Sequence, residues 1–127
     1  MIDKKTIADP ESRYGSARAA TRHFIVQRLT GMANILFLLF FAWFVVRLAG
    51  AERAEMVAVV AHPVVAIVLS LLIVNVTAHM RIGMREVIED YIEEGRVNRF
   101  SLLCNDMFAL GIALLALGSI AKIVFWG

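Results

Sequence analysis

The sequence predicts an all-α membrane protein that crosses the bilayer three times. Three observations lead to this fold class: 60% of the residues are hydrophobic, the mean hydropathy is +0.73, and the apolar residues are gathered into three long runs. A soluble domain is usually about 45–50% apolar, because polar residues must cover its surface. The chain has 127 residues, the length of a single domain, so residues 1–127 are predicted to form one membrane domain.

The first predicted span covers residues 29–48, in which Arg47 is the only charged residue. About 20 apolar residues cross the hydrocarbon core, and a long arginine side chain near the end can reach the headgroups. The preceding residues, 1–28, are polar and are predicted to stay in the cytoplasm. Within them, the stretch 16–28 is compatible with a helix that lies along the membrane surface.

The second predicted span covers residues 58–82. Pro63 lies near its start, and proline is tolerated in the first turn of a helix. The core of this span is therefore expected to begin near His62. No strong breaker except Gly83 precedes Tyr91, so the helix is expected to continue beyond the apolar run.

The third predicted span covers residues 101–125, after a connection marked by Gly95 and Asn98. Asn105 and Asp106 follow soon after the start of this span. We expect these two residues to begin the third helix, because a carboxylate is favourable near the positive end of the helix dipole.

Lysine and arginine residues predict the orientation in the membrane. Six of them precede the first span and four surround the second connection, whereas two lie around the first loop and one near the C-terminus. Cytoplasmic segments carry the excess of these residues. We therefore expect a cytoplasmic N-terminus and a periplasmic C-terminus.

Composition excludes several classes of protein. The basic residues flank the apolar runs, so the net charge of +2 does not indicate nucleic-acid binding. The single cysteine, Cys104, forms no intrachain disulfide and no paired-cysteine metal site. Residues 1–23 lack an apolar core and contain acidic residues, which is typical neither of a signal peptide nor of a mitochondrial transit peptide. A multi-pass protein of the bacterial inner membrane, inserted without cleavage, is expected.

The second predicted helix carries polar residues at a regular spacing. On a helix, Asp90 lies only ~20° around the axis from His79 and ~16 Å along it, Gly83 lies ~40° from His79, and Tyr91 lies ~120° away. One stripe therefore presents an imidazole, a position without a side chain, and an acid, an arrangement suited to a flat cofactor beside a polar pocket. The alternatives are a solvated interfacial histidine, a glycine for close helix packing, and an Asp-Tyr pair that caps or anchors the helix.

These residues resemble those of a known family. The pattern H-x-x-x-G-x-x-x-x-x-x-D-Y, from His79 to Tyr91 on the second of three spans, resembles the hydrophobic membrane anchor of succinate dehydrogenase, respiratory complex II. The start of the first span is also similar to this family, through His23-Phe24, Gln27-Arg28 and Thr30. The likeness covers most of the chain.

The resemblance implies a role for each residue of the motif. His79 would be an axial ligand of a b-type haem, whose second histidine comes from the partner anchor. Tyr91 would bind a carbonyl of ubiquinone, and Asp90 would support that site. Arg28 and His23 would lie near the haem propionates or the quinone pocket.

The resemblance also implies partners: the cytochrome b anchor, packed with this chain in one helical bundle, an iron–sulfur subunit, a flavoprotein and membrane lipid. The chain would hold no catalytic residue of its own and would act only within the complex. Two other functions stay open, the anchor of a quinol-linked fumarate reductase and a cofactor-free assembly or structural protein. Arg81 and Arg85 make the motif more basic than the family pattern, and they are candidates to bind propionates, lipid phosphates or the iron–sulfur subunit.

Overall fold

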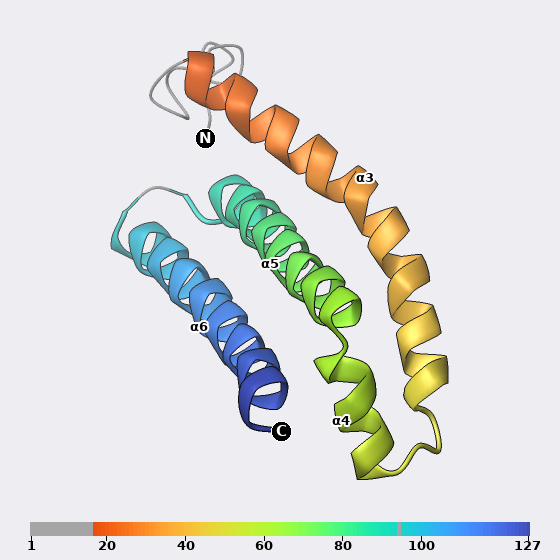
Figure 1. Ribbon diagram of the computed structural model, residues 1–127. Helices are drawn as coiled ribbons and strands as arrows, with labels where there is room; N and C mark the ends of the chain where they lie inside the picture. Colours follow the sequence, from red (N-terminus) through yellow and green to blue (C-terminus); the bar gives the residue numbers. More distant parts are fainter. Residues whose placement is uncertain (1–16, 94) are drawn as a thin grey trace.

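The computed structural model describes residues 17–93 and 95–127, and every regular element in this part of the chain is a helix (Figure 1). The helices, in chain order, are α3 (Ala17–Leu48), α4 (Arg53–Ala61), α5 (Pro63–Tyr91) and α6 (Arg96–Trp126). The predicted all-α architecture is confirmed.

Three of the helices are long and apolar enough to cross a membrane: α3 with 32 residues, α5 with 29 and α6 with 31. At 1.5 Å per residue each exceeds the ~30 Å hydrocarbon core, so its ends extend into the headgroup regions. The N-terminal end of α3 and the α5–α6 connection lie at one end of the molecule (Figure 1). The α3–α4 connection and the C-terminus lie at the other.

The first helix is longer than the predicted span, since it begins at Ala17 rather than near Leu29. The stretch before the span is helical, but it is continuous with the span and does not form a separate surface helix. The residues from 17 to 28 include neither proline nor glycine, so nothing in the backbone interrupts the helix there.

The second helical segment breaks at His62 because of the proline that follows. A residue before proline is pushed out of the helical region, and His62 has φ −59° and ψ 128°. Pro63 then begins α5, and the backbone N–H of Val64 donates to His62 Nδ1 at 3.3 Å. The predictions that the span begins near His62 and that its helix reaches Tyr91 are confirmed.

The interior of the helical bundle is small. Val60, Leu69 and Ile120 form its buried cluster, and α3 has no fully buried residue. Large apolar side chains such as Leu36 remain 71% exposed. Surfaces of this kind belong in lipid or against other membrane subunits, where apolar side chains need no cover from water.

The expected start of the third helix is wrong. The helix begins at Arg96, after Gly95 with φ 133°, so Asp106 lies well inside it. Because the dipole effect fades within the first turn, it does not explain this carboxylate. Instead, Asp106 Oδ1 lies 2.7 Å from Arg81 Nε, and the buried Asn105 donates to the Arg81 carbonyl at 2.9 Å. These two bonds join α6 to α5.

Candidate functional site

His79 lies on the side of α5 that packs against α3. Its Nδ1 is 2.9 Å from the Thr30 hydroxyl oxygen. A Cβ atom on Gly31 would come within 3.3 Å of the imidazole Cε1, so the ring rests where the α3 backbone carries no side chain. The imidazole is half-buried, and among the described residues Thr30 is its hydrogen-bond partner.

Gly83 allows a second close approach between α5 and α3. A Cβ on Gly83 of α5 would lie 3.3 Å from Nε2 of Gln27 on α3. Each helix therefore receives a polar side chain of the other above a glycine, as small residues permit between membrane helices. In the predicted stripe on α5, Gly83 is the position without a side chain. Gln27 fills the space above it, so this space is not open to a flat cofactor.

One turn deeper, two asparagines link the same helices. Asn75 Nδ2 donates to the Thr30 carbonyl at 3.0 Å and also to Asn34 Oδ1. We call this interface the polar seam and define it by Gln27, Thr30 and Asn34 on α3 and by Asn75 and His79 on α5. Interhelical hydrogen bonds within a membrane each contribute about 0.6–2 kcal/mol, so the seam fixes the rotation of both helices.

The asparagines of the seam and Gly31 were not among the predicted site residues. Their spacing contained a signal: residues 27, 30 and 34 lie on one face of a helix, and so do residues 75, 79 and 83. Two matching polar faces on successive spans indicate that those faces meet.

Charged groups extend the seam toward the α5–α6 connection. Arg85, Glu86 and Glu89 are close enough to act electrostatically on the His23 imidazole. Arg85 is itself paired with Glu89, with 3.1 Å between Nε and Oε1. The two arginines of the motif that depart from the family pattern therefore each have a carboxylate within this chain, Glu89 for Arg85 and Asp106 for Arg81.

The structure does not bring Arg28 beside His79. Arg28 is exposed and lies over the ring of Phe24, with its Cζ 5.1 Å from the ring centroid. On α3 it lies ~200° around the helix axis from Thr30, on the side turned away from α5.

Asp90 and Tyr91 occupy the last turn of α5 and are both exposed, Tyr91 to 83%. The rise from His79 to Tyr91 is ~18 Å. The predicted site residues of α5 therefore form two groups along this helix, an imidazole held against α3 and an Asp-Tyr pair at the helix end.

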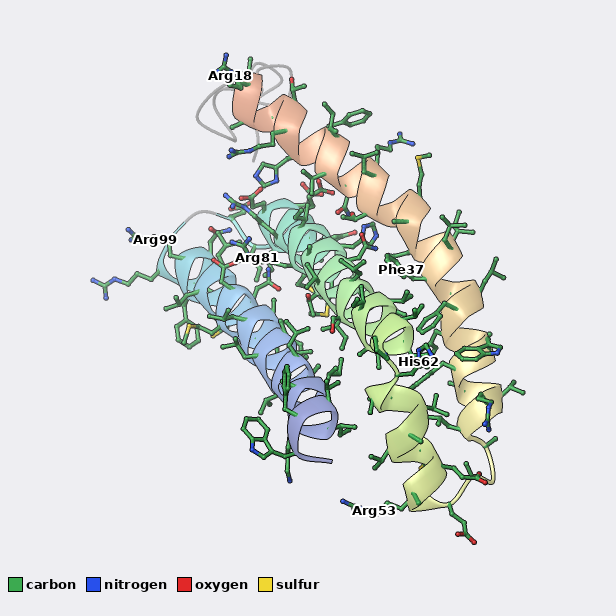
Figure 2. The ribbon with its side chains drawn as sticks, in the orientation of Figure 1. Arg18, Phe37, Arg53, His62, Arg81 and Arg99 are labelled. Atoms are coloured by element: carbon green, nitrogen blue, oxygen red, sulfur yellow. The ribbon has the colours of Figure 1, made fainter. Side chains whose placement is uncertain are left out.

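His62 lies at the break between α4 and α5, whereas Arg81 lies nearer the α5–α6 connection (Figure 2). His62 borders a hollow of about 530 Å³ together with Trp43 and Arg47. The rise from His62 to His79 is ~26 Å, so His62 lies at the start of α5 and His79 beyond its middle.

Comparison with known proteins identifies the family of this chain. The family model described as succinate dehydrogenase/fumarate reductase transmembrane subunit matches residues 2–120. The chain belongs to this family. It is 24% identical over 96 residues to the succinate dehydrogenase hydrophobic membrane anchor subunit of Rickettsia bellii (strain RML369-C), an alignment that covers 76% of this chain and 77% of the relative. No solved structure matches the chain.

Membership of this transmembrane-subunit family confirms the likeness that the motif indicated. Together with the three candidate spans, it makes the chain a multi-pass membrane subunit. A transmembrane subunit of this family associates with other subunits of its complex, which agrees with the large apolar area that α3 leaves exposed.

Proposed function

We propose that this subunit anchors a succinate:ubiquinone oxidoreductase to the membrane, that His79 would hold the iron of a haem b, and that Tyr91 forms part of the ubiquinone-reduction site. The observation that carries the proposal is the half-buried imidazole of His79, whose Nδ1 contacts Thr30 and whose Nε2 has no hydrogen-bond partner among the described residues. A histidine ligand of a metal typically uses one ring nitrogen for the metal and the other for a hydrogen bond.

The residues present fit a haem shared between two chains. The described residues hold no group of three or more metal-ligating side chains, and a haem needs only one histidine from each of two subunits. His79 would hold the iron, and the cytochrome b anchor would supply the second histidine. When bound, the haem supplies a one-electron redox centre, while the seam holds the imidazole of this chain in place.

The quinone site would lie at the other group of residues. The Tyr91 hydroxyl can donate a hydrogen bond to a quinone carbonyl, and its ring is suited to the membrane interface. Asp90 would orient that hydroxyl or accept and release a proton. The iron–sulfur subunit would dock at this end of α5, and the flavoprotein would oxidise succinate beyond it.

His23 and Arg28 remain candidates for the haem propionates or the quinone pocket. His23 faces the same charged end of α5 that leads to Tyr91. Arg28 lies on the outer side of α3, so it would meet a group held between this chain and a partner rather than one inside the seam.

A quinol-linked fumarate reductase is the second candidate function, because the family description covers both enzymes. The relative from Rickettsia bellii is a succinate dehydrogenase anchor, which favours succinate oxidation. The family match argues against a cofactor-free assembly protein.

A spectrum of the purified complex tests the proposed function. We expect an affinity tag on this chain to recover the iron–sulfur subunit and the flavoprotein, with the absorbance bands of a b-type haem after reduction. The preparation should couple succinate oxidation to ubiquinone reduction. Recovery of both proteins without haem absorbance would exclude haem ligation, and recovery of the chain alone would exclude the anchor function.

The orientation in a bacterial inner membrane has its own test. Arg18 and Arg99 lie at one end of the molecule and Arg53 at the other (Figure 2). Because the arginine-rich end should be cytoplasmic, we expect alkaline phosphatase fused after Gly127 to be active in the periplasm. A fluorescent cytoplasmic reporter fused at the same residue should stay dark, and the opposite pair of results would reverse the topology.

A further inference from the structure

The geometry points to Thr30 as a positioning residue for the haem iron: its hydroxyl oxygen fixes the imidazole of His79 in the form that carries its proton on Nδ1, and Gly31 provides the space for the ring. This inference rests on the proposed ligation by His79. It assigns a role to a residue that never touches iron.

The direction of the hydrogen bond follows from the other contacts of Thr30. Its hydroxyl oxygen also lies 2.7 Å from the Val26 carbonyl and 3.2 Å from the Gln27 carbonyl. A hydroxyl has a single proton, and a threonine within a helix commonly donates it to the carbonyl four residues earlier, here Val26, which is also the shortest contact. With its proton on the Val26 carbonyl, the hydroxyl oxygen accepts toward His79, in the tautomer that carries the imidazole proton on Nδ1.

A neutral imidazole with its proton on Nδ1 has its lone pair on Nε2. This is the nitrogen that has no hydrogen-bond partner among the described residues, and a lone pair is what a metal ligand requires. Thr30 therefore selects both the tautomer and the ring nitrogen that keeps the lone pair.

Thr30 is itself held at both ends. Its hydroxyl proton is directed to the Val26 carbonyl, and its own carbonyl accepts from Asn75 Nδ2 at 3.0 Å. Because Asn75 lies one turn before His79 on α5, the bond also fixes the register of the two helices. The acceptor for Nδ1 thus belongs to a rigid part of the seam.

Gly31 sets the distance between the imidazole and α3. A Cβ at this position would lie 3.3 Å from Cε1 and 3.9 Å from Nδ1 of His79. Contact at 3.3 Å is tighter than ordinary van der Waals packing, so an alanine would displace the ring by a few tenths of an ångström. That displacement would lengthen the bond to Thr30.

The hydrogen bond should change the iron as well as the ring. A donor bond from Nδ1 makes the other nitrogen a stronger base, which favours ferric over ferrous iron. Loss of such a partner typically costs about 10–100-fold in metal affinity. Without the Thr30 hydroxyl, the haem should therefore have a higher midpoint potential and be released faster.

The test compares Thr30→Val, which keeps the shape and removes the hydroxyl, with Thr30→Ser, which keeps the hydroxyl. In the assembled complex we measure the haem midpoint potential by optical redox titration and the rate of haem transfer to apomyoglobin. We expect T30V to raise the potential and to speed transfer by roughly tenfold or more. T30S should stay close to the unsubstituted complex in both measurements.

Thr77 offers a matched control, because its hydroxyl bonds two carbonyls of its own helix, Ile73 at 2.6 Å and Val74 at 3.1 Å. We expect Thr77→Val to leave potential and transfer rate unchanged. Equal effects of T77V and T30V would overturn the inference, since both would then report a general loss of packing.

Two further outcomes separate this inference from the proposed ligation. If His79→Ala abolishes the haem signal while T30V leaves potential and transfer unchanged, the ligation stands and the role of Thr30 is refuted. If T30V complexes do not accumulate, the haem-transfer rate is measured for Gly31→Ala instead. Faster transfer than in the unsubstituted complex supports the inference, and an unchanged rate overturns it.

Discussion

Complexes with His79→Ala should lose the haem b spectrum or show it strongly altered. The imidazole is the only histidine side chain of the described residues that lies within the polar seam, and Thr30 and Gly31 hold it in place. An alanine supplies no nitrogen to iron, and axial ligands help to set the haem potential. The measurement is the dithionite-reduced minus oxidised spectrum of the purified complex, with haem quantified as its pyridine adduct.

His62→Ala is the matched control for this experiment. His62 lies near the other end of the same span, where it caps α5, so its loss should leave the haem bands nearly unchanged. The exchanged result, with haem lost only on removal of His62, would assign the ligand to the break between α4 and α5. If His79→Ala kept the haem bands and the midpoint potential of the unsubstituted complex, His79 would not be a ligand of the haem iron.

Tyr91→Phe should assemble normally and reduce ubiquinone at least about tenfold more slowly. A quinone that is becoming a quinol gains negative charge on its oxygens, and a positioned hydroxyl stabilises that charge. Loss of one donor at a developing oxyanion typically costs about 2.7–4 kcal/mol. Tyr91 is 83% exposed in this chain, so a partly wet site should lose less, and tenfold corresponds to about 1.4 kcal/mol.

Two electron acceptors separate the quinone site from the rest of the complex. Succinate oxidation with an artificial dye that bypasses the quinone site should stay at the unsubstituted rate in Tyr91→Phe, whereas ubiquinone reduction falls. Trp126→Phe is the control, because Trp126 is a similarly exposed aromatic side chain, 78%, at the other end of the bundle. Unchanged rates with both acceptors in Tyr91→Phe would exclude the tyrosine from the quinone site.

Much of the fold was predictable because it depends on local properties of the chain. The length of each apolar run determines a membrane span, and the proline after His62 determines where the second segment breaks. The motif from His79 to Tyr91 could also be recognised in the sequence, because all its residues lie on one helix. The predicted start of the third helix was wrong, because the carboxylate of Asp106, near the start of the third apolar run, was attributed to the helix dipole.

The sequence by itself determined the three spans, the break at Pro63 and the order of polar residues along each helix. Only the tertiary structure decided which polar residues meet: Thr30 with His79, Gln27 with Gly83, and Asp106 with Arg81. The physical reason is that hydropathy acts along a single helix, whereas the rotation and register of two helices follow from their packing. In lipid, where apolar faces gain little from meeting each other, glycine contacts and interhelical hydrogen bonds make that choice.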